Sequence, residues 1–153
     1  DEGTLNRNFQ GYTTDNAAAL LGIGASSIGR LPQGYVQNVV AMKTYEDEVL
    51  SGHLPIAKGI QLNDDDQLRG MVIERLMCDL EVDLKAVCQQ FGLDVSYFSE
   101  ELNNLQPFED KNIISVDDGR IVVRSEARML VRNICAVFDI YLSRGLARHS
   151  KAV

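Results

Sequence analysis

An Asp-Gly turn between two β-rich runs is the feature that most constrains the fold of this chain. Residues 113–116 (Ile-Ile-Ser-Val) and 120–123 (Arg-Ile-Val-Val) flank the pair Asp118-Gly119. Such a pair is a strong signal for a β-hairpin, because both residues accept the positive φ angles of a tight type I′ turn. The sequence therefore predicts an antiparallel hairpin late in the chain.

Three predicted helices precede this hairpin. The first begins near Asp64, after the good N-cap residue Asn63. Its apolar stripe recurs at i, i+3 and i+4 spacing and consists of Leu68, Met71, Val72, Leu76 and Leu80. The second helix covers about residues 84–91 and is closed by Gly92, and the third covers about residues 96–105 and stops before Pro107.

A long helix is predicted to follow the hairpin from Ser125. Its apolar face would consist of Leu130, Ile134, Phe138, Tyr141 and Leu142. Three helices, a two-stranded wing and a closing helix are typical of a winged-helix arrangement. The expected fold class is thus α+β, mainly helical, with a winged-helix-like domain over residues 63–153.

Residues 1–62 have a different pattern. Leu20, Leu21 and Ile23 fit a short buried strand that ends by Gly29. Near-helical spacing of apolar residues predicts a helix over about residues 36–50, and alternation predicts a strand over residues 56–62. A glycine and a helix cap near residues 59–63 mark the expected domain boundary, so that the two domains are residues 1–62 and 63–153.

Charge and hydropathy exclude several classes of function. The net charge of −7 opposes non-specific binding to phosphate backbones, and the third predicted helix contains no Lys or Arg, so no nucleic-acid partner is expected. No apolar run approaches the roughly 20 residues that a membrane span needs. A cytoplasmic protein without a membrane span is predicted. An acidic winged-helix interaction or regulatory module stays open as an alternative.

The sequence also gives little indication of a metal site or a catalytic nucleophile. The cysteines Cys78, Cys88 and Cys135 are widely spaced among apolar neighbours, which predicts buried, reduced thiols and no metal site. His53 and His149 are isolated from other ligand types. The run of acidic residues 64–66 suits a helix start better than a metal loop. No serine or cysteine stands in a nucleophile motif, so no catalytic residue is expected.

Two runs near the start of the chain are typical of loops that frame a ligand. Residues 7–14 read Arg-Asn-Phe-Gln-Gly-Tyr-Thr-Thr, and residues 21–29 read Leu-Gly-Ile-Gly-Ala-Ser-Ser-Ile-Gly. Gly22-x-Gly24 superficially matches a dinucleotide fingerprint, but the helix that should begin there is delayed beyond Pro32. Small residues that let a strand end pack closely against a loop or ligand are the preferred interpretation.

Together with residues 65–78, residues 132–135 (Arg-Asn-Ile-Cys) and several shorter stretches, these motifs resemble the C-terminal part of the oxygen-independent coproporphyrinogen III dehydrogenase (oxidase) family. This bacterial family belongs to the radical-SAM enzymes of haem synthesis. The resemblance covers nearly the whole chain. Related haem chaperones carry a tryptophan near the position of Tyr12, and this chain has no tryptophan, so that branch is the less favoured alternative.

The resemblance implies an activity and its cofactors. Members use a reduced [4Fe–4S] cluster and S-adenosylmethionine to oxidise two propionates of coproporphyrinogen III to vinyl groups, which gives protoporphyrinogen IX. The CxxxCxxC loop that holds the cluster is absent from these 153 residues. The chain is therefore expected to be a C-terminal fragment. In isolation it would be inactive and would bind neither cofactor. Its expected partner is the N-terminal radical-SAM barrel of the same parent chain.

The resemblance also implies site residues. Phe9, Gln10 and Ile28 fall on family positions that help to form the cofactor region, including a second S-adenosylmethionine site. Gln10 offers an amide donor and a carbonyl acceptor, while Phe9 and Ile28 offer apolar walls. Residues that bind the substrate carboxylates are not identified; Arg7, Arg30 and Arg132 are candidates, and none is preferred. Residues 1–62 would be the last strand and helix elements of the partial (β/α) barrel.

Overall fold

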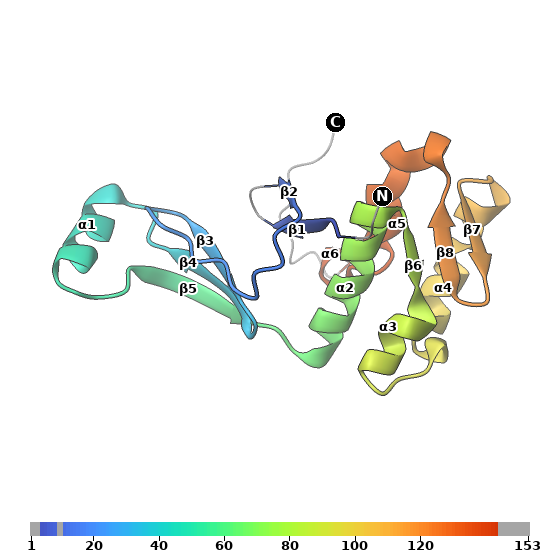
Figure 1. Ribbon diagram of the computed structural model, residues 1–153, viewed down its shortest axis with the longest axis horizontal. Coiled ribbons are helices and arrows are strands. Elements are labelled where there is room, and N and C mark those ends of the chain that lie inside the picture. Colours follow the sequence, from blue (N-terminus) through green and yellow to red (C-terminus); the bar gives the residue numbers. More distant parts are fainter. Residues whose placement is uncertain (1–3, 9–10, 144–153) are drawn as a thin grey trace. The chain divides into compact units, whose positions relative to one another are not determined.

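The structure, a computed structural model, describes residues 4–8 and 11–143. The chain divides into two compact units, which are shown in Figure 1. Unit 1 comprises Asp1–Arg7 and Asp64–Val153, and unit 2 comprises Asn8–Asn63. Two short strands near the start, β1 (Asn6–Asn8) and β2 (Gly11–Thr13), pair in a two-stranded sheet.

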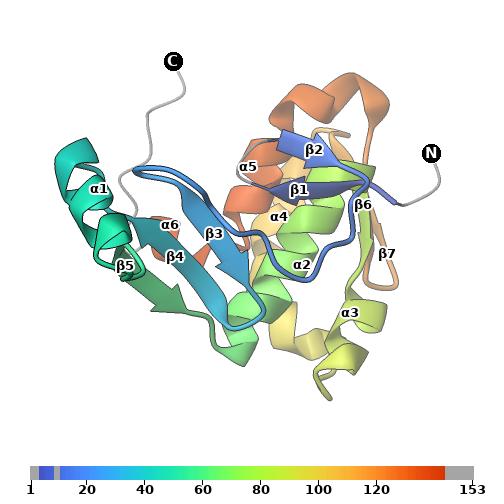
Figure 2. The same ribbon diagram turned by 60° about the vertical axis from the view of Figure 1, so that its left-hand side comes forward.

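Unit 2 is built on a three-stranded antiparallel sheet in the order β3-β4-β5. Its strands are β3 (Ile28–Leu31), β4 (Gly34–Asn38) and β5 (Ile56–Gln61), and helix α1 (Met42–Leu50) lies at the end of the sheet where β4 passes to β5 (Figures 1 and 2). Gly34 has φ of +152°, and a Cβ there would overlap the carbonyl oxygen of Ile60. A glycine at this position therefore lets β5 approach the β3–β4 hairpin.

The sequence predicted unit 2 only in part. The strand β5 confirms the alternating segment at residues 56–62. The predicted strand at Leu20–Ile23 is wrong, because Leu20 makes an isolated bridge with Arg30 and Leu21 and Ile23 are 74% and 89% exposed. The predicted helix over residues 36–50 is correct only from Met42. Residues 34–38 form a strand because β3 and β5 supply its hydrogen-bond partners, and β5 lies almost 20 residues further along the chain.

The topology of unit 2 differs from that of a simple barrel repeat. Strands of a (β/α) barrel are parallel and joined through helices. In unit 2 all pairings between β3, β4 and β5 are antiparallel, and the described residues contain no closed barrel. The expected barrel elements thus take the form of an antiparallel sheet with one helix.

The main segment of unit 1 starts at Asp64 with α2 (Asp64–Asp79), β6 (Glu81–Asp83) and α3 (Leu84–Gln90). A short 3-10 helix, η1 (Val95–Phe98), leads into α4 (Ser99–Asp110), and the hairpin β7 (Ile114–Asp117) and β8 (Arg120–Val123) follows. β6, β8 and β7 lie side by side in an antiparallel sheet (Figure 1). The hairpin is confirmed, and Asp118 and Gly119 have φ of +48° and +86°, as a type I′ turn requires.

Three details of unit 1 differ from the expectation. The strand β6 was not predicted; it follows Leu80, which leaves α2 with φ of +61° although it is not a glycine. Helix α4 continues through Pro107 to Asp110. The long closing helix is wrong, because the chain forms η2 (Ser125–Leu130), α5 (Val131–Ala136) and α6 (Ile140–Ser143) instead.

Asp139 explains one of these breaks. Its carboxylate accepts hydrogen bonds from the backbone N–H groups of Tyr141 and Leu142 at 2.9 and 3.1 Å, which caps a new helix start. Just before it, Val137 and Phe138 donate to carbonyls three residues back, which tightens the end of α5. Ile134 and Phe138 still belong to the core, but Leu130, Tyr141 and Leu142 are 36–43% exposed.

The hydrophobic core lies entirely in unit 1. Every buried hydrophobic residue of the described chain falls between Leu68 and Phe138, and the largest fully buried side chains are Phe98 and Phe138. In unit 2, α1 has no buried residue and β5 is exposed along its whole length. Among the described residues, no helix is long and apolar enough to cross a membrane.

Candidate functional site

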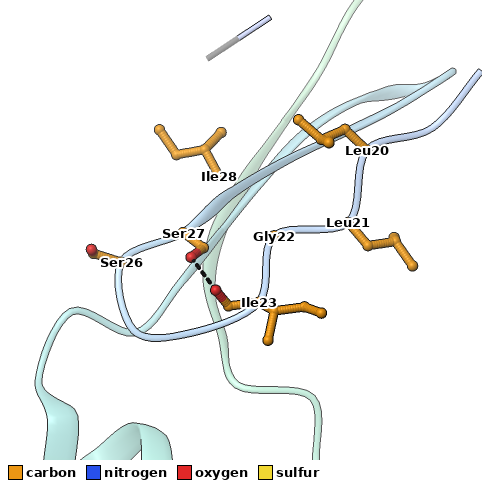
Figure 3. A pocket seen from close by; sticks show the side chains of 7 residues that line it. All are labelled: Leu20, Leu21, Gly22, Ile23, Ser26, Ser27 and Ile28. Atoms are coloured by element: carbon orange, nitrogen blue, oxygen red, sulfur yellow. Dashed lines mark hydrogen bonds between the residues drawn. The ribbon is translucent and has the colours of Figure 1, made fainter. Parts of the chain in front are cut away.

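A hollow of about 320 Å³ opens on unit 2, where the glycine-spaced run enters the sheet. Figure 3 shows the side chains that line it: Leu20, Leu21, Gly22, Ile23, Ser26, Ser27 and Ile28. Its volume is at the lower end of the range of small-molecule pockets, and its lining is mainly apolar with two serine hydroxyls. The hollow is thus small and mainly apolar.

The loop that lines the hollow has no regular secondary structure, yet hydrogen bonds tie it closely to the sheet. The side-chain amide of Asn38 donates to the carbonyls of Gly22 and Gly24, both at 3.0 Å. The backbone N–H of Asn38 donates to the carbonyl of Ser27 at 2.9 Å. Asn38 is only 8% exposed, at the end of β4 where the register with β5 shifts. A single buried side chain thus closes the loop.

Further contacts fix the same loop from other sides. The N–H of Gly24 donates to the phenol oxygen of Tyr45, on α1, at 3.0 Å. The hydroxyl of Ser27 donates to the carbonyl of Ile23 at 2.7 Å (Figure 3), and the N–H of Ser26 donates to the carbonyl of Val39 at 2.9 Å. The carbonyls of Gly22, Ile23 and Gly24 thus all accept hydrogen bonds from side chains.

Two glycines permit the close packing beneath the loop. A Cβ on Gly22 would lie 2.9 Å from the Cβ of Ser27, and a Cβ on Gly29 would lie 2.9 Å from the carbonyl oxygen of Leu20. Neither distance is possible for a real side chain without movement of the backbone. This packing explains the glycine spacing. It agrees with the prediction that small residues let a strand end pack closely against a loop, and it does not require a dinucleotide fingerprint.

The structure describes one of the three predicted cofactor-binding residues. Ile28 begins β3, is half-buried and lines the hollow. Phe9 and Gln10 lie outside the described residues. Sequence reasoning did not single out Asn38 or Tyr45, because an asparagine at the end of a strand and a tyrosine on a helix carry no signal of their long-range partners.

The three basic candidates for carboxylate binding are all exposed. Arg7 lies on β1, Arg30 on β3 and Arg132 on α5. None of them forms an ion pair within the described part of the chain. No one of them is favoured by its position.

The cysteines are free thiols on three different elements; Cys88 and Cys135 are buried, as expected, whereas Cys78 is only partly buried. Burial raises the pKa of Cys135, on α5, to about 11, and burial also raises the pKa values of Cys78 and Cys88. Thiols with raised pKa values stay protonated at neutral pH and are poor ligands for metals. Over residues 4–8 and 11–143, no three His, Cys, Asp or Glu side chains converge in a way that would hold a metal ion.

Comparison with known proteins defines the class of this chain. Residues 62–130 match the family described as HemN C-terminal domain. The whole chain is 44% identical over 153 residues to the oxygen-independent coproporphyrinogen III oxidase of Bradyrhizobium diazoefficiens, and it covers 34% of that protein. It is 42% identical over 142 residues to the enzyme of the same name from Salmonella typhimurium, of which it covers 31%.

A solved structure agrees with these sequence matches. The chain matches coproporphyrinogen III oxidase (HemN) from Escherichia coli, described as a radical SAM enzyme, with a TM-score of 0.86 and 40% identity. The match covers 92% of this chain and 32% of that one. The chain thus carries a HemN C-terminal domain. Over its whole length it is similar to oxygen-independent coproporphyrinogen III oxidases, and it spans about a third of the length of these relatives.

Proposed function

We propose that this chain is the C-terminal third of an enzyme that oxidatively decarboxylates two propionates of coproporphyrinogen III, which gives protoporphyrinogen IX in anaerobic haem synthesis. The observation that carries the proposal is the 44% identity to an enzyme of that name over all 153 residues. Each propionate side chain loses a hydrogen atom, CO₂ and an electron, and a vinyl group remains. The chain alone is expected to be inactive.

The surface of unit 2 supports a larger parent protein. Its described hydrophobic residues are exposed to an unusual degree: Leu21 74%, Ile23 89%, Val40 69%, Met42 62%, Leu50 85% and Leu54 80%. Exposed apolar side chains that gather into a patch normally mark a binding interface. We infer that the N-terminal radical-SAM barrel of the same polypeptide covers it, and that residues 1–62 extend the barrel through the antiparallel sheet β3-β4-β5.

Residues 63–153 are proposed to be a winged-helix-like domain with a packing role. The order of α2, α3, α4 and the hairpin β7–β8 supports this description. Helix α4 would occupy the position that reads DNA in relatives of this fold. Its sequence contains Glu100, Glu101 and Glu109 but no Lys or Arg, which opposes contact with phosphates.

The proposed activity requires S-adenosylmethionine and a [4Fe–4S] cluster in the parent enzyme. The cluster is expected to be held by the closely spaced thiolates of a CxxxCxxC loop, whereas the three thiols here lie singly on α2, α3 and α5, so these residues do not fit it. We propose that another part of the parent chain holds the cluster. Free thiols support a reducing, cytoplasmic location.

The hollow on unit 2 fits part of S-adenosylmethionine better. Ile28 supplies an apolar wall there, and we propose that Phe9 and Gln10 complete the same region. S-adenosylmethionine supplies the radical chemistry when it is bound in the parent enzyme. The residues of this chain bind and orient it: apolar walls exclude water, and the amide of Gln10 donates and accepts hydrogen bonds.

An anaerobic assay tests the proposal. The full-length parent enzyme, supplied with S-adenosylmethionine, a reductant and coproporphyrinogen III, is expected to release CO₂ and form protoporphyrinogen IX. The isolated 153-residue chain, incubated with iron and sulfide, is expected to develop no [4Fe–4S] absorption and to form no product. A full-length enzyme that leaves coproporphyrinogen unchanged, or an isolated chain that acquires a cluster and cleaves S-adenosylmethionine, would refute it.

A further inference from the structure

We propose that Asn38, assisted by Tyr45, is a positioning residue that preforms the wall of the cofactor site carried by the loop from Leu20 to Ile28. The inference rests on the proposed function, since it concerns the same hollow. It adds two residues that do not line the hollow themselves. Their role is to hold the backbone of the residues that do.

The contacts of Asn38 show why its amide is suited to this role. The carbonyls of Gly22 and Gly24 both point at the side chain, and a primary amide offers one N–H to each, at 3.0 Å. An aspartate of the same shape has only acceptor oxygens when ionised. It would place negative charge against two carbonyl oxygens in a site that is 8% exposed.

The loop conformation decides which side chains reach solvent. The carbonyls from Gly22 to Gly24 all accept hydrogen bonds from side chains. Leu21 and Ile23, which line the hollow, are exposed and point away from Ile28 (Figure 3). Ser26 adopts φ of +62°, an uncommon conformation for a residue with a side chain. Such a conformation persists only where its surroundings hold it. The N–H of Ser26 donates to the carbonyl of Val39 at 2.9 Å and its carbonyl accepts the amide of Gln37 at 3.2 Å, while Asn38 and Tyr45 hold the nearby Gly24.

Tyr45 contributes the second support from a different element. Its hydroxyl accepts the N–H of Gly24, the glycine at the tip of the loop, which has φ of +103°. Gly24 is thus held on both sides, through its carbonyl by Asn38 on β4 and through its N–H by Tyr45 on α1. Binding a ligand to a loop that is already ordered avoids the entropy cost of ordering it.

The test uses the full-length parent enzyme with its cluster and compares Asn38→Asp, Tyr45→Phe and wild type. Asn38→Asp is expected to raise the KM for S-adenosylmethionine by about tenfold or more, and Tyr45→Phe by about threefold, as for the loss of buried hydrogen bonds. The KM for coproporphyrinogen III is expected to stay unchanged. Hydrogen exchange at Gly24, Ser26 and Ser27 should become faster in both variants.

Two controls separate positioning from general destabilisation. Asn104→Asp makes the same chemical change at an exposed site on α4. Gly52→Ala strains a turn of unit 2 at φ of +77° with no heavy atom within 4 Å of the new Cβ. Both controls are expected to keep the wild-type KM, and Gly52→Ala should lower only the melting temperature.

The outcomes are distinguishable. If wild type converts coproporphyrinogen III but Asn38→Asp and Tyr45→Phe keep its KM for S-adenosylmethionine, the positioning role is overturned and the proposed function stands. If Gly52→Ala raises the KM for S-adenosylmethionine as much as Asn38→Asp does, the positioning role is also overturned, because lower stability would then account for the higher KM. An inactive wild-type enzyme overturns the proposed function and this inference together.

Discussion

The guanidinium of Arg69, on α2, donates a 2.7 Å hydrogen bond to the carboxylate of Glu101, on α4, and both side chains are only 12% exposed. Arg69 also donates to Asp65 at 2.8 Å and stacks 5.3 Å from the ring centre of Phe98. The pair therefore joins two helices of unit 1 beside Phe98, one of the two phenylalanines of the core.

Removal of one member of this pair should destabilise unit 1 strongly. Arg69→Met leaves Glu101 as a buried carboxylate without its partner, which costs about 3 kcal/mol or more. Urea unfolding followed by circular dichroism measures the loss. The control is Arg120→Met, which breaks the exposed pair with Glu81, whose side chains are 58% and 44% exposed, and should leave the midpoint unchanged. Equal midpoints for Arg69→Met and wild type would contradict the prediction.

The thiol of Cys135 predicts a stability loss in alkaline solution. Its pKa is raised from 9.0 to about 11 by burial, so between these values the unfolded chain releases a proton that the folded chain keeps. The contribution of this thiol to the free energy of unfolding is fully present below pH 9. It is lost towards pH 11 at up to about 1.4 kcal/mol for each pH unit. Denaturant unfolding from pH 8 to 11 measures this loss.

The matched variant for this experiment is Cys135→Ala, because lysines and tyrosines titrate in the same pH range. The difference in unfolding free energy between wild type and variant isolates the thiol. We expect that difference to shrink above pH 9. A constant difference would show that the thiol ionises as easily in the folded protein as in the unfolded chain.

Gly34 should be far less tolerant of a side chain than Gly52. Both have positive φ, +152° and +77°, but only at Gly34 would a Cβ overlap a backbone carbonyl, that of Ile60. Gly34→Ala is expected to cost about 3 kcal/mol and to separate β5 from the hairpin, while Gly52→Ala costs about 1 kcal/mol of backbone strain. Amide exchange in β4 and β5 that becomes faster in Gly34→Ala but not in Gly52→Ala would support this difference in tolerance. Similar exchange in both variants would contradict it.

Gln10 is expected to matter for turnover in the full-length enzyme. Gln10→Ala removes an amide that we propose binds S-adenosylmethionine, so the rate should fall by about tenfold while the melting temperature stays the same. The control is Gln90→Ala, which removes an exposed glutamine from the end of α3. If Gln10→Ala keeps the wild-type turnover, the proposed role of Gln10 in binding S-adenosylmethionine is wrong.

Local signals in the sequence determined much of unit 1. The Asn63-Asp64 helix start, the apolar stripe from Leu68 to Leu76 and the Asp118-Gly119 turn each encode a short-range preference, and the structure confirms all three. The motif residues also carried the resemblance to the family, and Ile28 lines the hollow that we propose binds part of the cofactor. These features depend on neighbours within a few residues, so sequence reasoning can find them.

Tertiary structure alone decided the rest. Residues 34–38 become a strand because β5 pairs with them from beyond α1, and β6 forms because β8 returns to its side almost 40 residues later. The closing helix breaks where Asp139 caps a new start, and the glycine-spaced run becomes an ordered loop because buried Asn38 bonds to carbonyls up to 16 residues away. No local preference encodes hydrogen-bond partners that only folding brings together.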